Sequence, residues 1–343
     1  MKRFVFGVAL PLLLAAFITA PGTTANAQDK TTLRMAVWLP PVHHLSHSLQ
    51  DWADEVEKAS GGSLVIQLDS APLAKPPGQY ELARKGVADM AYHVLGYTPG
   101  RFEILRATEL PFISPNAEIG SQATWDWYER NVGTKEMEDV KLITLWIHGP
   151  GLVHTKKEVK TLEDLKGVKL RVGGGGVAMA EALGAVPVPM SATQAHESLQ
   201  RGTTDGTMFP WESISGFRLT KLVGYHLEIP GGLYSTPFAL VMNSKAFDKL
   251  SPEHQAVLNE KGGIWGAKFI GKRWDDADAT GRRDAEANGN KIQQIDAAEL
   301  ERWRTKIAFM NDEWIKKADA NGWDGKALLE DLRATMEKFG ATN

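Results

Sequence analysis

The sequence predicts an α/β protein whose core is divided between two domains, and three observations lead to this class. Short segments rich in β-branched and apolar residues alternate with amphipathic segments up to about residue 242. The connections between them are short, which is typical of sheets covered by helices. A Gly/Pro cluster at 148–151 and a Ser-Thr-Pro segment at 235–237 are the expected crossings between the two domains.

The spacing of apolar residues gives the elements of the first part in order. Leu49, Trp52 and Val56 fall on one face at helical spacing, and Gly61 and Gly62 end that helix. Runs of β-branched and apolar residues indicate the strands. The expected strands are 31–38, 64–68, 87–94 and 141–147, and the expected helices are about 45–59, 80–85 and 117–131.

The second part of the chain begins after the first crossing. The expected strands are 168–172, 186–188, 204–208 and 238–242, with helices after the glycines at 173–176 and over 193–202. From 252 to about 291 and from 296 to 339 we expect helices only, the first of them bent at its glycines. Trp303, Ile307, Met310 and Trp314 form a stripe on one helix face, which indicates core packing.

The N-terminal segment predicts export. Lys2 and Arg3 precede the apolar run 4–18, and Ala25-Asn26-Ala27 is a small-x-small cleavage site. This pattern is typical of a secretory signal peptide covering residues 1–27, and the apolar run is too short for a membrane anchor. We therefore expect a mature protein in the periplasm.

Composition excludes several classes of function. The 343 residues include no cysteine, which removes thiolate zinc sites and thiol nucleophiles. The net charge of -3, with both signs spread evenly, is unlike the basic surface of a nucleic-acid-binding protein. Eleven tryptophans stand out. Most should lie in the core, and some could line a ligand site.

Arg171 is the first candidate binding residue. It lies at the end of the expected strand 168–172, beside four glycines and the start of a helix. Free N–H groups and the helix dipole favour anions at such a place, and a guanidinium can bind a carboxylate through two parallel hydrogen bonds. The local sequence is equally consistent with a surface arginine beside a strand.

Other chemistries have weaker support. Gly173, Gly175 and Ala178 satisfy the dinucleotide pattern G-x-G-x-x-A, but no acidic residue stands at the ribose position, so we expect no cofactor. His43 and His47 are four residues apart, yet no third ligand follows at a metal-site spacing, so we expect no metal and a structural or solvent-facing role for them and for His44. The common hydrolase motifs are missing.

The segment 205–212, DGTMFPWE, is the second candidate for a site. Phe209 and Trp211 place two aromatic rings, and Glu212 one acid, near the expected domain crossing. Aromatic walls with few polar groups are typical of a small-molecule cleft. Taken alone, the same residues could pack a hinge, with Glu212 capping a helix that begins at Ser213.

Together these motifs resemble the solute-binding receptors of TRAP (tripartite ATP-independent periplasmic) transporters, of the C4-dicarboxylate-receptor type. The resemblance is carried by TLEDLKGVKLRV and the following segment at 161–190, LQRGTTDGTMFP at 199–210 and STPFALVMNSKAFDKL at 235–250. It covers nearly all of the chain after the signal peptide, and the LKGxKxRV block is its most specific part.

The resemblance implies an α/β two-lobe periplasmic binding protein with mixed sheets, a hinge, and a long helix spanning both lobes. It implies lobe I at 28–150 plus about 237–275, and lobe II at 151–236 plus about 276–343. It also implies a monomeric receptor without enzymatic activity, which captures a ligand by closure and docks on the membrane subunits of the transporter. The arginine that pairs with the ligand carboxylate in this family falls on Arg171.

Two departures from the family pattern bear on the ligand. Phe209 stands where many relatives carry asparagine, and no second arginine follows the first crossing at 148–152. We therefore expect a monocarboxylate with an apolar or aromatic body rather than a dicarboxylate or sialic acid. Its expected walls are Trp38, Phe209 and Trp211, and its expected hydrogen-bonding residues are Tyr92, His93, His148 and Tyr234.

Glu212 leaves alternatives open. It could pair with a ligand amine, accept from ligand hydroxyls, or hold a cation that bridges to the carboxylate. If it pairs with Arg171 instead, the site is neutral and a polyol becomes possible. A periplasmic enzyme or a sensory receptor on the same fold are the remaining alternatives for the whole protein.

Overall fold

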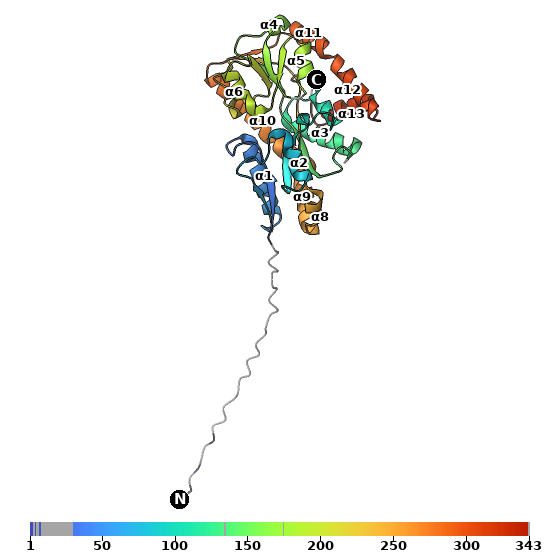
Figure 1. The fold of residues 1–343 in the computed structure, drawn as a ribbon. Coiled ribbons are helices and arrows are strands. Elements are labelled where there is room, and N and C mark those ends of the chain that lie inside the picture. The colour runs from blue at the N-terminus through green and yellow to red at the C-terminus, as the bar shows by residue number, and fades with distance from the viewer. Residues whose placement is uncertain (3, 5–6, 8–29, 134, 174, 342–343) are drawn as a thin grey trace.

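The computed structural model describes residues 1–2, 4, 7, 30–133, 135–173 and 175–341 (Figure 1). Except for residues 1, 2, 4 and 7, the expected signal peptide lies outside these residues. Among the helices of the described part, none is both long and apolar enough to cross a membrane.

Two mixed sheets form the centres of two lobes (Figure 1). The first sheet has the order β2-β1-β3-β10-β4 and the second has the order β11-β9-β5-β8-β6-β7. In the first sheet β10 runs antiparallel to both of its neighbours, while β1 is parallel to β2 and β3. Because β10 belongs to the sheet that contains β1, the chain crosses to the second lobe after β4 and returns before β10.

The strand bounds are as follows. The first sheet contains β1 (Thr31–Ala36), β2 (Leu64–Leu68), β3 (Met90–Val94), β4 (Lys141–Ile147) and β10 (Pro237–Met242). The second contains β5 (Leu152–Thr155), β6 (Lys169–Val172), β7 (Val186–Pro189), β8 (Gly206–Phe209), β9 (Tyr225–Glu228) and β11 (Lys291–Gln294). These sheets confirm the predicted fold class.

Helices cover both sheets. Those that accompany the first sheet are α1 (His44–Ala59), α2 (Gln79–Arg84), α3 (Ala117–Asn131), α8 (Ser244–Asp248) and α9 (Pro252–Lys261). Those of the second are α4 (Leu162–Leu165), α5 (Val177–Ala182), α6 (Ala195–Gln200) and α7 (Glu212–Gly216). The C-terminal part contains α10 (Gly263–Ala287), α11 (Ala297–Ile307), α12 (Phe309–Ala320) and α13 (Gly325–Lys338).

The long helix α10 joins the two lobes. Asp275 accepts hydrogen bonds from the backbone N–H groups of Ala117 and Glu118, at 2.7 and 2.9 Å, where α3 begins in the first lobe. Three residues later, Asp278 accepts from the backbone N–H of Glu212 at 2.7 Å, where α7 begins in the second lobe. Each carboxylate satisfies N–H groups that have no partner within their own helix. One helix therefore caps a helix of each lobe.

Glycines allow α10 to approach this closely. A Cβ atom at Gly271 would lie 2.7 Å from the carbonyl oxygen of Ala117, and one at Gly281 would lie 2.1 Å from that of Trp211. Both neighbours are backbone atoms and cannot move aside alone. The glycines that predicted bends therefore serve as contact points between α10 and the helices it caps.

The structure corrects several element predictions. The segments 64–68, 117–131 and 141–147 have the predicted bounds, but β5 and β9 were not predicted and β11 lies where only helix was expected. These strands have four residues each, too few for a period-2 pattern to be recognised, and β11 is defined by its pairing with β9.

The C-terminal helices divide between the lobes, which differs from the predicted boundaries. Residues from about 276 onward were expected in lobe II, yet α13 packs on α3, where Trp127 Nε1 donates to the carbonyl oxygen of Leu328 at 2.9 Å. In α12, Trp314 Nε1 donates to the carbonyl oxygen of Glu103 at 2.9 Å. The predicted apolar stripe is split between α11 and α12, so Trp303 and Trp314 belong to different hydrophobic clusters.

Replacing Gly281 with alanine should destabilise the protein. The added methyl group overlaps the backbone of Trp211, and overpacking of this kind costs about 1–3 kcal/mol, more than the gain of up to about 1 kcal/mol from alanine's helix propensity. Thermal unfolding measures the effect. Gly224→Ala is the matched control, because a Cβ there meets no atom within 4 Å. Equal melting temperatures for the two variants would contradict the close approach of α10 to α7.

Candidate functional site

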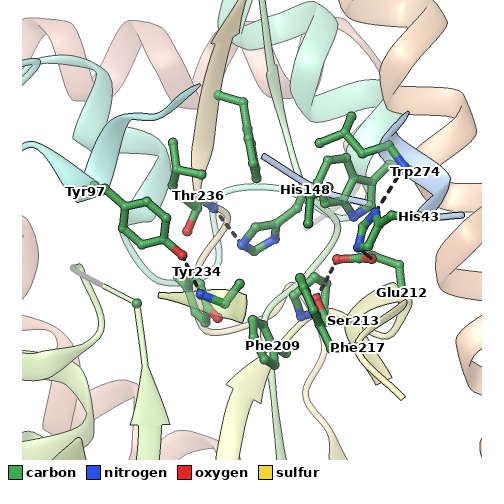
Figure 2. A pocket seen from close by; sticks show the side chains of 18 of the residues that line it. His43, Tyr97, His148, Phe209, Glu212, Ser213, Phe217, Tyr234, Thr236 and Trp274 are labelled. Atoms are coloured by element: carbon green, nitrogen blue, oxygen red, sulfur yellow. Dashed lines mark hydrogen bonds and ion pairs between the residues drawn. The ribbon is translucent and has the colours of Figure 1, made fainter. Parts of the chain in front are cut away.

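A cavity lies between the two lobes, and its walls come from both of them (Figure 2). The space free of atoms between the lining residues is about 570 Å³, part of the open mouth included. Seven of the lining residues carry the aromatic rings of Trp38, Tyr97, Phe209, Phe217, Tyr234, Phe238 and Trp274. Seven others carry polar side chains, and these are His43, Glu109, His148, Arg171, Glu212, Ser213 and Thr236.

Arg171 lies in β6, between β7 and β8, and its side chain is only 2% exposed. Nη2 donates to the carbonyl oxygen of Met190 at 2.8 Å, and the guanidinium carbon lies 4.1 Å from the centre of the Phe209 ring. Among the described residues, no carboxylate lies within ion-pair distance of it, and Nε has no hydrogen-bond partner. A buried cation without a counter-ion is unfavourable, so this site favours a bound anion.

Phe209 is positioned by a pair of buried histidines. His154 Nε2 lies 3.0 Å from the carbonyl oxygen of Phe209, and Nδ1 lies 2.7 Å from His226 Nδ1. A carbonyl oxygen only accepts, so His154 carries its proton on Nε2 and accepts at Nδ1 from His226. His226 then accepts at Nε2 from the side chain of Asn290, 2.9 Å away. Both histidines are neutral in this arrangement, and burial lowers the pKa of each, that of His226 to about 4.

Glu212 pairs with histidine rather than with Arg171. Its Oε2 lies 2.9 Å from His44 Nε2 and 3.9 Å from His43 Nε2, while Oε1 accepts from Ser213 Oγ at 2.5 Å. Burial would raise the pKa of this carboxyl, but the two histidines and Ser213 outweigh burial and lower it to about 2. Glu212 is therefore a buried carboxylate, and the neutralised Arg171–Glu212 site considered from the sequence is not formed.

These three side chains are also close enough to suggest a metal site. One donor atom each from His43, His44 and Glu212 lies within 4.8 Å of the others. The sequence analysis found no third ligand near the histidines, because Glu212 is distant along the chain and comes from the other lobe. His47, the other half of the predicted pair, is exposed and is not part of this group.

Two contacts between the lobes close the cavity. Tyr97 of the first lobe accepts at its hydroxyl oxygen from the backbone N–H of Ala192 of the second, at 2.9 Å (Figure 2). Glu109 of the first lobe lies against the glycine loop, where a Cβ atom at Gly175 would be 2.3 Å from its Oε2. Gly175 therefore makes room for the side chain of Glu109.

The cavity contains six of the nine predicted ligand-binding residues: Trp38, His148, Arg171, Phe209, Glu212 and Tyr234. His148 and Tyr234 are already engaged within the protein. His148 Nε2 accepts from the backbone N–H of Thr236 at 3.0 Å, and the Tyr234 hydroxyl donates to the carbonyl oxygen of Met208 at 2.9 Å. They therefore form walls, with less free hydrogen-bonding capacity than expected.

The other three predicted residues do not line the cavity, which corrects the sequence-based assignment. His93 alternates with Tyr92 along β3, so it points to the opposite face of the sheet and packs against Tyr80 and Phe102. Tyr92 is fully buried behind the ring of Trp38, 5.6 Å away.

Trp211 is the third of them, and it turns away from the cavity. Its ring packs against His154 and His226, with centroids 5.1 and 4.7 Å apart, and its Nε1 donates to Glu228. The second tryptophan of the cavity lining, besides Trp38, is Trp274 of α10. The sequence carries no local sign of this role, because Trp274 lies on a helix far from both crossings.

Comparisons with known proteins agree with this geometry. The model of the bacterial extracellular solute-binding protein family 7 (DctP) matches residues 35–317. A TRAP periplasmic solute-binding protein from Bordetella bronchiseptica with bound (R)- and (S)-mandelate is 34% identical, with a TM-score of 0.86 over 90% of this chain and 99% of that one.

Two further solved structures are similar. A TRAP solute-binding protein from Rhodoferax ferrireducens in complex with copurified benzoate is 32% identical, with a TM-score of 0.86 over 90% of this chain and 98% of that one. A marine metagenome TRAP solute-binding protein described as specific for aromatic acids, in complex with 3-hydroxybenzoate, is also 32% identical, with a TM-score of 0.87 over 91% of this chain and 100% of that one.

The buried histidines predict that stability falls with acidification. Burial lowers the pKa of His43, His148 and His226 to about 4 and that of His93 to about 3. Their pKa in the unfolded chain is about 6.5, so between pH 6.5 and 4 the unfolded chain binds more protons. Each group then removes up to about 1.4 kcal/mol of stability per pH unit on acidification through this window.

Urea unfolding at a series of pH values from 7.5 to 5 measures this dependence. We expect little change above pH 7 and a steep loss below 6.5. Replacing the exposed His47 with glutamine should leave the slope unchanged. Buried Glu136, whose pKa burial raises to about 7, opposes part of this loss because it binds a proton in the folded state. A free energy of unfolding that stays constant from pH 7 to pH 5 would contradict the predicted net loss.

Proposed function

The chain belongs to family 7 of the bacterial extracellular solute-binding proteins, the receptors of TRAP transporters, and from this premise we propose that it captures a monocarboxylate with an aromatic body. The ligand is enclosed in the cavity between the lobes and delivered to the membrane subunits of the transporter. The receptor is exported by its signal peptide, works in the periplasm as a monomer, and releases its ligand unchanged.

The observation that carries this proposal is the state of Arg171. Its guanidinium is buried in the cavity wall, and among the described residues no carboxylate lies within ion-pair distance. A ligand carboxylate would supply the missing charge, and a guanidinium can bind it through two hydrogen bonds. Such charge-assisted bonds are strong in an environment from which water is excluded.

The rest of the cavity favours a single carboxylate on a flat apolar body. Arg171 is the one arginine or lysine in its lining as far as the structure describes it, while Glu109 and Glu212 are both acidic. A second ligand carboxylate would meet like charge and no second guanidinium. The walls offer aromatic faces, which favour aromatic rings. The relatives with bound mandelate, benzoate and 3-hydroxybenzoate support this ligand class.

Capture requires that the lobes move. The connections between them are the two crossings, the junction of α11 with α12, and α10, which caps α3 and α7 from residues about one turn apart. Opening would break the contact of Tyr97 with Ala192 and separate Glu109 from the glycine loop, while the caps on α10 stay intact. Closure around a bound acid restores both contacts, and hinge motions of this kind involve few residues.

Replacing Arg171 with methionine should abolish acid binding and raise the melting temperature of the ligand-free protein. The variant removes the bond to the ligand carboxylate, and it also removes a buried charge without a counter-ion. We expect at least a hundredfold loss of affinity for benzoate, measured by isothermal titration calorimetry. Differential scanning calorimetry of the ligand-free protein measures the stability.

The matched control is Arg201→Met, since Arg201 belongs to the same lobe and is 73% exposed. It should change neither benzoate affinity nor thermal stability appreciably. If Arg171→Met bound benzoate as tightly as the wild type, Arg171 would not be the carboxylate-binding residue.

Replacing Phe209 with asparagine should shift selectivity away from aromatic acids. The variant removes the ring that stacks on the Arg171 guanidinium and restores the residue found at this position in many relatives. We expect the affinity ratio of benzoate to succinate to fall at least tenfold. Phe112→Asn, at a ring outside the cavity lining, serves as the control and should leave the ratio unchanged. An unaltered ratio in Phe209→Asn would contradict the role of this ring.

A further inference from the structure

Five buried polar atoms of the cavity lining have no hydrogen-bond partner among the described residues: Nε1 of Trp38, Nε1 of Trp274, Nε of Arg171, Nε2 of His43 and Oε2 of Glu212. The last two lie close together, and their side chains are 2% and 3% exposed. His43 belongs to the first lobe and Glu212 to the second (Figure 2). Their distance of 3.9 Å is too long for a direct hydrogen bond. Leaving such groups unsatisfied is costly, so a ligand atom that pairs with them would be favoured.

The position of the proton on His43 follows from its place at the start of α1. Its Nδ1 accepts a hydrogen bond from the backbone N–H of Leu45 at 3.2 Å, so Nδ1 holds a lone pair. The imidazole therefore carries its proton on Nε2, which is a donor. Burial lowers the pKa of His43 to about 4, which agrees with a neutral ring. His43 was not among the residues expected to bind the ligand.

Glu212 supplies the complementary acceptor. Ser213 occupies Oε1. Oε2 lies 2.9 Å from Nε2 of His44 but outside hydrogen-bond geometry, and His44 borders a separate surface pocket instead of the cavity. A carboxylate oxygen has a second lone-pair site, so Oε2 can accept one more hydrogen bond from the cavity side. His43 and Glu212 thus present one donor and one acceptor, a short distance apart.

We propose that His43 and Glu212 form a hydroxyl-binding subsite, and that the preferred ligands are hydroxy-substituted aromatic monocarboxylates. The ligand hydroxyl accepts from His43 Nε2–H and donates to Glu212 Oε2, while its carboxylate pairs with Arg171. This inference rests on the proposed function and specifies the ligand class within it.

The same geometry argues against the other two uses of Glu212. An ammonium group has donors and no acceptor, so it would leave the Nε2–H of His43 unpaired. A metal ion needs a lone pair on each ligand atom, but the Nε2 of His43 carries a proton while Nδ1 accepts from Leu45. A hydroxyl both donates and accepts, and it satisfies the two groups at once.

Isothermal titration calorimetry with the ligand-free receptor tests the subsite. The probes are benzoate, 3- and 4-hydroxybenzoate, their methyl ethers, and the pair phenylacetate and mandelate. We expect at least one hydroxylated acid to bind about tenfold or more tightly than its unsubstituted parent, because a site built to pair with a hydroxyl discriminates against analogues without one. Where that acid is a hydroxybenzoate, its methyl ether should also bind more weakly, since an ether cannot donate to Glu212.

Two variants test whether the preference for hydroxylated acids depends on His43 and Glu212. His43→Asn keeps a side chain that can cap α1, but it does not extend to the position of Nε2. Glu212→Gln keeps the shape and removes the charge. In both, the affinity ratio of hydroxylated to unsubstituted acid should fall to within about threefold. His47→Asn, at an exposed histidine on the same helix, should leave the ratio as in the wild type.

The outcomes separate this inference from the function on which it rests. Equal binding of hydroxylated and unsubstituted acids by the wild type, or a preference that persists in both variants, would overturn the subsite and leave the aromatic-acid receptor intact. A preference that disappears with EDTA would assign the pair to a cation and also overturn it. Failure of every acid in the panel to bind would overturn the proposed function itself.

Discussion

The rest of the site depends on a guanidinium that is buried without a counter-ion. Removing Arg171 from water costs free energy that the protein offsets only in part, through one carbonyl oxygen and the face of Phe209. A bound carboxylate would offset the remainder. Binding of the carboxylate and closure of the lobes are then coupled, because residues of both lobes exclude water from Arg171. A receptor built in this way is expected to be less stable empty than filled.

The second constraint is the position of α10. Asp275 and Asp278, separated by about one turn of α10, accept from the first N–H groups of α3 and α7. Gly271 and Gly281 allow the backbones to approach within distances that a side chain would prevent. The helix that joins the lobes is thus fixed to each of them by short-range contacts. Relative motion must occur in the crossings and in the helix between these two points of contact.

Several polar groups in and behind the cavity wall are paired within the protein. His154 and His226 form a neutral chain of hydrogen bonds that ends on the carbonyl oxygen of Phe209, and His148 binds the backbone at Thr236. Because these groups are satisfied within the protein, the unsatisfied ones are informative. In the cavity lining they are the guanidinium of Arg171, the pair formed by His43 and Glu212, and the indole N–H groups of Trp38 and Trp274. Selectivity would then come from a few polar positions set in an aromatic wall.

The sequence by itself determined the fold class and the segments 64–68, 117–131 and 141–147, because each rests on local pattern. Arg171 was proposed from its strand end together with the family resemblance, since its local sequence fitted a surface arginine equally well. The sequence also placed Phe209 and Glu212 correctly at the cavity. It misplaced Trp211, Tyr92 and His93, because the direction of a side chain depends on strand twist and on the neighbours that compete for each face.

The tertiary structure alone decided which distant residues meet. Trp274 lines the cavity because α10 passes behind both lobes, and His43 faces Glu212 because the starts of α1 and α7 come together. A pattern of local spacing contains no information on such pairs, since their proximity arises from packing between segments far apart in the chain. The sequence shows which chemical groups each residue carries, and the fold decides which other residues those groups contact.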